Sequence, residues 1–272
     1  LNFQIAGTRI FGSVSRAVDT ALMTGRLDVV APDVSLAAAL LLQDAAGSIN
    51  AALVLAPVDG TQQVGLTANA SGLTVNDIVV GRADITGTVS DLFGVPVANG
   101  TIAASDVKAA GATITTLNAR ADQSGDTTRF DGEAALATGT RVDLAGALAP
   151  TDGGYRLSLD RANLTQGTLA ARLASPTELI VRDNAVSLDA LRFDVGSGSI
   201  MATGTAGETL NMRVQISALP LSIANTIVPS LGLAGTLEGT AVISGSSSDP
   251  QVQFQAQGGG INAAAIQPFG IA

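Results

Sequence analysis

The chain has 272 residues, of which 46% are hydrophobic and 14% charged, and its formal net charge is −9. This composition excludes a disordered chain, and 14 scattered Lys and Arg residues do not supply the clustered positive charge that nucleic-acid binding requires. Aromatic residues make up 3% and Trp is absent, so we expect thin, repetitive layers rather than one deep core.

The first expected element is a short amphipathic helix over residues 13–25. Ser13 stands where an N-cap belongs, and Gly25 stands just beyond the expected end. The apolar residues at helical spacing are Val14, Ala17, Val18, Ala21 and Leu22.

Most of the remaining chain shows the period-two alternation of β-strands. The alternating apolar positions are Ala83/Ile85/Val89, Val142/Leu144, Tyr155/Leu157/Leu159, Leu191/Phe193/Val195, Leu210/Met212/Val214/Ile216 and Val252/Phe254/Ala256. Turn residues separate such segments at Asp59-Gly60, Asn99-Gly100, Ser124-Gly125, Asp152-Gly153-Gly154 and Gly207. The pattern predicts an antiparallel meander with one apolar and one hydrated face.

Two motifs resemble ligand sites but are better explained as turns. The first has the spacing of a calcium loop at Asp122, Ser124, Asp126 and Glu133, yet Thr127 occupies the position that requires Gly. The second, "GSGSIMATG", lacks the third glycine of a dinucleotide fingerprint. We predict a hairpin turn in the first and a tight turn in the second.

A second helical segment is expected between Pro220 and Pro229. The apolar residues Ile223, Ala224, Ile227 and Val228 form one helical stripe there. With its flanks, this segment reads "LPLSIANTIVPSLGL".

The chain offers little to catalysis. It has no His and no Cys, which removes the usual nucleophilic and metal-binding constellations. Its acidic residues fall mostly at turns or on polar strand faces. We therefore expect no enzyme, no cofactor and no metal site.

The long apolar face has two interpretations that the residues leave open. It packs into a closed core, as in a β-sandwich or a β-solenoid that serves as a stalk, adhesin or assembly scaffold, or it lines a groove open to a long apolar ligand. A membrane β-barrel is disfavoured, because its aromatic girdles would need more than seven Phe and one Tyr.

A family resemblance favours the groove. Residues 186–214 follow "v.l..l.l..G.G.i.a.G..g..l...v", residues 219–239 run from an "lPL" turn to "P.L.L.G.L.G", and residues 242–258 follow "v.G...dP.v.f....g". In this order, residues 175–258 resemble TamB-like proteins of the AsmA-like superfamily. Residues 1–180 are similar in style only, as a repetitive β-sheet segment, and residues 181–272 would begin the TamB-like C-terminal domain.

The resemblance implies an all-β fold, an elongated, curled antiparallel sheet ("β-taco") with a hydrophobic groove and one or two short helices. It also implies a periplasmic protein of a Gram-negative bacterium, anchored in the inner membrane through a segment absent here, so we expect a piece of a longer chain. Such proteins work with an outer-membrane TamA-like barrel partner, in phospholipid transport and in outer-membrane protein assembly and secretion.

The groove hypothesis assigns phospholipid acyl chains to the apolar side chains of the C-terminal strands. The proposed lining residues are Leu191, Phe193, Val195, Leu210, Met212, Val214, Ile216, Leu237, Ala241, Ile243, Val252 and Phe254.

Overall fold

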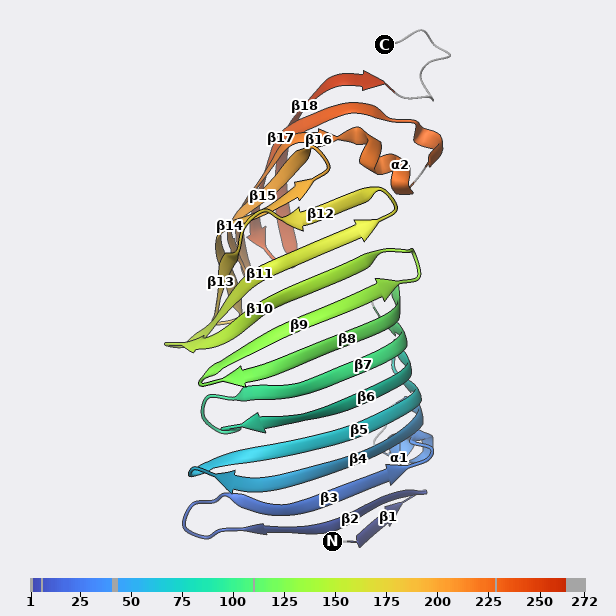
Figure 1. The fold of residues 1–272 in the computed structure, drawn as a ribbon, viewed down its shortest axis with the longest axis vertical. Coiled ribbons are helices and arrows are strands. Elements are labelled where there is room, and N and C mark those ends of the chain that lie inside the picture. Colours follow the sequence, from blue (N-terminus) through green and yellow to red (C-terminus); the bar gives the residue numbers. More distant parts are fainter. Residues whose placement is uncertain (1, 6, 41–43, 110, 228, 263–272) are drawn as a thin grey trace. The chain divides into compact units, whose positions relative to one another are not determined.

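The computed structural model describes residues 2–5, 7–40, 44–109, 111–227 and 229–262. These residues form eighteen strands of one antiparallel sheet, with only short helical segments (Figure 1). The all-β fold predicted from the alternation is confirmed. The chain divides into two compact units, Leu1–Thr138 (unit 1) and Gly139–Ala272 (unit 2).

Unit 1 is a meander in which each strand pairs with its neighbours in sequence. Its elements are β1 (Asn2–Ile5), β2 (Thr8–Arg16), β3 (Met23–Ala31), α1 (Ser35–Leu40), β4 (Ala45–Val58), β5 (Thr61–Val75), β6 (Ile78–Ser90), β7 (Val97–Ala109), β8 (Ala112–Ser124) and β9 (Thr127–Leu136).

Unit 2 continues the same pattern with one interrupted strand. The long β11 pairs at one end with β12 and at the other with β13. The elements are β10 (Arg141–Thr151), β11 (Gly154–Gln166), β12 (Leu169–Leu173), β13 (Thr177–Arg182), β14 (Ala185–Val195), β15 (Gly198–Ala206), β16 (Thr209–Pro220), η1 (Leu221–Ile223), α2 (Ala224–Ile227), η2 (Pro229–Leu231), β17 (Ala234–Ser246) and β18 (Asp249–Asn262). The boundary expected at residue 181 falls within β13.

The helix expected over residues 13–25 is wrong. These residues form the end of β2, a turn and the start of β3, with Val14 paired to Gly25. Val18, which belonged to the proposed apolar stripe, is fully exposed. Cross-strand pairing has overridden a helical periodicity that spans little more than two turns.

Most of the expected turns are confirmed, and one is wrong. Hairpin turns lie at Asp59-Gly60, Gly125-Asp126, residues 152–153 and Gly207. The second helical segment appears as η1, α2 and η2, and Val228 of its predicted stripe lies outside the described residues. Asn99-Gly100 instead lies inside β7, paired with Thr88 and Gly87 of β6. Glycine there serves a close approach between strands and not a reversal of the chain.

Aligned interruptions of the strand pairing cross unit 1. At one level of unit 1, one residue in each of the strands β4–β8 has no register partner: Gly47, Gly72, Gly81, Asp106 and Thr115. The register shifts beside two of these residues, between Ala46 and Ser48 of β4 and between Ile114 and Thr116 of β8, which marks a β-bulge at each. Such bulges bend strands and increase twist, which curls the sheet.

Few apolar side chains of either unit are buried. Among the described residues the buried hydrophobic ones are Ala31, Val97, Ala162, Leu188 and Val195. The protein exposes 16150 Å², whereas a compact monomer of 27.0 kDa exposes about 10,800 Å². The apolar faces are therefore not gathered into a shared dry core.

Candidate functional site

The twelve residues proposed from the sequence lie on one face of unit 2. In β16 they are alternate residues, and the registers carry this face onto the neighbouring strands. One row of paired residues contains Met212, Ile243 and Val252. A second contains Leu191, Ala202, Val214, Ala241 and Phe254, and a third contains Phe193, Ile200 and Ile216.

The remaining proposed residues lie beside these rows and differ in exposure. Leu210 pairs with Gly245, and Leu237 with both Leu219 and Gly258. Val195, at the end of β14, is 6% exposed, whereas Val252 and Phe254 in β18 are 60% and 55% exposed. The face is thus closed near the β14–β15 turn and open along β18.

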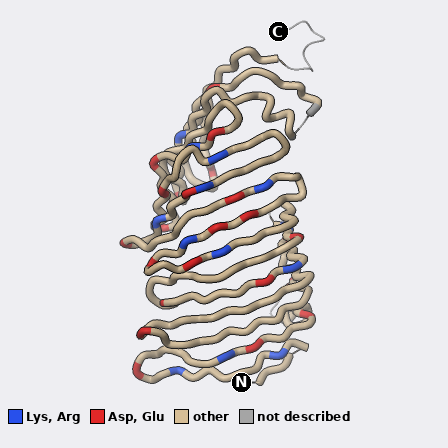
Figure 2. The backbone as a smooth tube through the Cα atoms, in the orientation of Figure 1, with Lys and Arg blue, Asp and Glu red and all other residues tan. Residues whose placement is uncertain are grey.

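The polar faces of both units carry ion pairs. Four strands carry an Arg-x-Asp motif whose two side chains form an ion pair two residues apart: Arg26–Asp28, Arg82–Asp84, Arg120–Asp122 and Arg192–Asp194. Figure 2 shows the sparse charges scattered along the strands, with long stretches that carry neither sign.

The Arg120 guanidinium forms two hydrogen bonds with the carboxylate of Asp122. Its Nε and Nη2 donate to the two carboxylate oxygens of Asp122 at 2.7 and 2.8 Å. These hydrogen bonds, with a smaller contribution from charge attraction, hold the pKa of Asp122 below its ordinary value. Asp28 beside Arg26 has a lowered pKa for the same first cause.

Unit 1 has an equivalent apolar face with a pronounced hollow. One register row runs Leu27, Leu53, Leu66, Gly87, Gly100, Ala121, Phe130 across β3–β9. The row Ile85, Ile102, Ala119 lies on one side of it, and Val64, Val89, Ala98 on the other. All of these residues except Leu27 line a cavity of about 450 Å³, which we name the glycine hollow.

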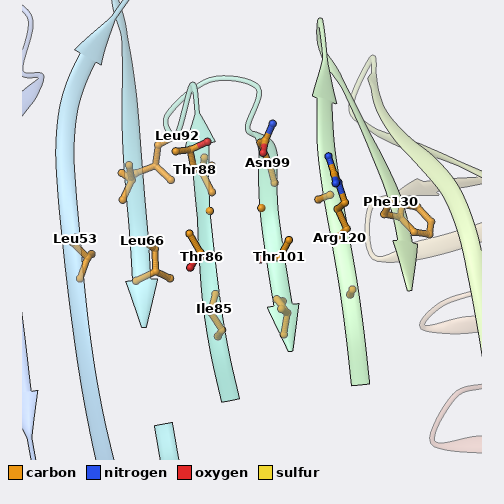
Figure 3. Close-up of a pocket in the computed structure, with 18 residues that line it drawn as sticks. Leu53, Leu66, Ile85, Thr86, Thr88, Leu92, Asn99, Thr101, Arg120 and Phe130 are labelled. Carbon is orange, nitrogen blue, oxygen red and sulfur yellow. The ribbon is translucent and has the colours of Figure 1, made fainter. Parts of the chain in front are cut away.

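The glycine hollow exists because two adjacent floor positions lack side chains. Gly87 and Gly100 pair directly, and a Cβ on Gly100 would lie 2.5 Å from Cα of Gly87. Leu53 and Leu66 stand on one side of this floor and Phe130 on the other (Figure 3).

A hydrogen-bonded loop positions Leu92 at one end of the hollow (Figure 3). The Leu92 N–H donates to the carbonyl of Gln62 at 3.0 Å, and the Val95 N–H donates to Oδ2 of Asp91 at 2.7 Å. Gln62 is 1% exposed and is itself fixed, because its amide group bonds both backbone groups of Met23. Leu92 is thereby held as a lining residue of the hollow.

Sequence reasoning did not find this second site. The residues of unit 1 that line it alternate only weakly, since Thr, Ala and Gly fill many strand positions. The sequence feature that indicates the hollow is a pair of glycines within strands, Gly87 and Gly100. Gly100 was instead predicted to lie in a turn. The two glycines come together through pairing between β6 and β7, and the sequence alone does not show which residues pair.

The described part of the chain contains no group of three or more His, Cys, Asp or Glu side chains arranged to hold a metal ion. The residues of the calcium-like motif lie at a β8–β9 hairpin, in which Ser124 pairs with Thr127. The helices α1 and α2, of six and four residues, fall far short of the length that crosses a membrane.

Comparison with known proteins identifies no relative of this chain. The chain matches no protein-family model, no curated protein and no solved structure.

Proposed function

We propose that the protein is a non-enzymatic, TamB-like conduit whose apolar faces carry phospholipid acyl chains across the periplasm between the inner and outer membranes. In this proposal the phospholipid headgroups stay in water while the acyl chains lie against the apolar face of the sheet. In this role it supports outer-membrane protein assembly and secretion with a TamA-like barrel partner.

One observation carries the proposal: each unit has a strand-to-strand apolar face that is only partly buried. A stalk or scaffold with a closed core needs a dry interior, and only five apolar residues among those described are buried. Partly exposed rows such as Met212, Ile243 and Val252 favour a ligand-lined face over that alternative.

The energetics of lipid transfer fit such a face. Each buried CH₂ contributes roughly 0.8 kcal/mol, so exposing an acyl chain of about 15 carbons to water costs on the order of 12 kcal/mol. Small aliphatic side chains offer many weak, equivalent contacts, which favour movement along the face over tight capture. The Arg-x-Asp pairs neutralise four of the 14 basic side chains, which reduces the positive charge available to anionic headgroups.

Photocrosslinking in Gram-negative cells tests the proposal. A photoreactive amino acid at Ile216 or Phe254 is expected to capture phospholipid, because both side chains lie on the apolar face. The matched positions Gln215 and Gln253 are their chain neighbours on the polar face and are expected to capture little.

A charge substitution provides the functional counterpart. Phe254→Asp is expected to slow phospholipid transfer between donor and acceptor vesicles, whereas Gln253→Asp leaves it near the parental rate. Both side chains are exposed, so folding is preserved in each. The proposal fails if Ile216 and Phe254 capture no lipid and both variants transfer it equally.

A further inference from the structure

We propose that the glycine hollow of unit 1 is a fixed seat for one phospholipid acyl chain, a station at which a chain pauses. The inference rests on the proposed function and specifies where on the apolar face an acyl chain is held. Its evidence is separate, since every lining residue lies in unit 1 and none belongs to the set proposed from the sequence.

The hollow is a built feature of the strands. Its floor depends on two glycines that the register places opposite each other, and any side chain at Gly100 would collide with the backbone of β6. Leu66 and Phe130 stand beyond the two sides of this floor, with Ala121 between Gly100 and Phe130. Its volume of about 450 Å³ lies within the range of small-ligand sites.

Charge and hydrogen bonding select an aliphatic occupant. The one charged lining residue is Arg120, whose guanidinium is bonded to Asp122. The uncharged polar lining residues alternate with the apolar-face residues of β6 and β7, so they belong with Arg120 to the polar face: Thr86, Thr88, Asn99 and Thr101. The floor residues lie within paired strands, so their backbone groups belong to the sheet ladder. A peptide segment would leave its own N–H and C=O groups unpaired here, whereas an acyl chain carries no such groups.

The hollow is also bordered at one end by Leu92, whose loop follows β6 (Figure 3). The Leu92 backbone is fixed to Gln62, and Gln62 is fixed to the start of β3. A chain in the hollow would meet Leu92 at this end, so its position along the strands is defined.

The test uses phosphatidylcholine with a photoreactive diazirine at the end of one acyl chain, incubated with the purified full chain and mapped by mass spectrometry. The parental protein is expected to be labelled saturably on peptides of β6–β9. Ala121→Phe fills the hollow and is expected to reduce the affinity of this labelling on the order of tenfold or more, the equivalent of about two buried methylenes. Ala121→Leu provides a smaller filling substitution if the first variant does not fold.

The matched control is Ala83→Phe, on the same face of β6 but outside the hollow. It is expected to retain saturable labelling of β6–β9. Equal loss in Ala121→Phe and Ala83→Phe, or labelling spread evenly over the apolar face, would overturn the seat and leave the conduit standing. Absence of labelling in both units would overturn the conduit as well.

Discussion

At the scale of single residues, the structure depends on a few polar side chains at strand ends. Gln62 is the most buried large side chain described, and its amide bonds Met23 N and Met23 O at 2.7 and 3.0 Å. It joins the beginning of β3 to the beginning of β5 where β4 turns. Its own carbonyl also receives Leu92 N–H, so one residue organises the end of the hollow.

Gln62→Ala is therefore expected to destabilise the protein. Each backbone group of Met23 left unpaired costs about 1–3 kcal/mol if it stays buried. Urea denaturation followed by circular dichroism measures the loss. Gln253→Ala, at an exposed position of β18, is the control and is expected to change little; equal effects of the two substitutions would refute the role given to Gln62.

The Arg-x-Asp pairs yield a prediction about pH. Because Arg120 lowers the pKa of Asp122, the pair stabilises the fold above the ordinary Asp pKa of about 3.9. That contribution disappears as the pH falls through the lowered value. Arg120→Gln is expected to raise the pKa of Asp122 and leave that of Asp28 unchanged, as a carboxyl-carbon NMR titration would measure. An unmoved Asp122 titration would contradict the assignment.

At the scale of strands, β-bulges such as the one between Ala46 and Ser48 of β4 keep the apolar face continuous across a register shift. A strand without its extra residue would turn every apolar residue beyond that point to the other face. Gly47 of β4 shows how specific the bulge is: its φ is +103°, and a Cβ there would lie 2.4 Å from the Gly72 carbonyl oxygen. The same phase shift occurs in unit 2, between Leu188 and Leu191.

Gly47→Ala is expected to reduce stability by roughly 1–3 kcal/mol, because it combines a strained φ with a backbone clash. Gly65→Ala in the paired strand β5 is the matched control. Its Cβ would meet Val54 at 3.7 Å, an ordinary contact, so it is expected to be neutral or to stabilise by up to about 1 kcal/mol. Denaturant titrations compare the two variants; similar values would show that the bulge tolerates a side chain.

At the scale of the whole molecule, the protein buries less surface than its length allows. The unfolded chain would expose about 39,000 Å². Folding to 16150 Å² therefore buries about 23,000 Å², against about 28,000 Å² for a compact protein of equal mass.

Calorimetry of the lipid-free protein is expected to register this difference. The heat-capacity increment of unfolding scales with exposed apolar surface, so it should fall about a fifth below the usual 12–15 cal/mol/K per residue. A value within or above that range would indicate apolar burial that the open faces do not provide. Repeating the measurement with phospholipid bound is expected to raise the increment.

Local sequence determined the strands, most of the hairpin turns and the single apolar face of unit 2, because alternation and turn chemistry act over a few residues. Leu210, Met212, Val214 and Ile216 were placed on one face by period two alone, and the registers agree. The tertiary structure decided what depends on pairing between strands. It made residues 13–25 a hairpin, set Gly87 against Gly100 to form the hollow, and aligned the bulges that curl the sheet. These features arise from register, which joins residues distant along the chain, so no local pattern contains them.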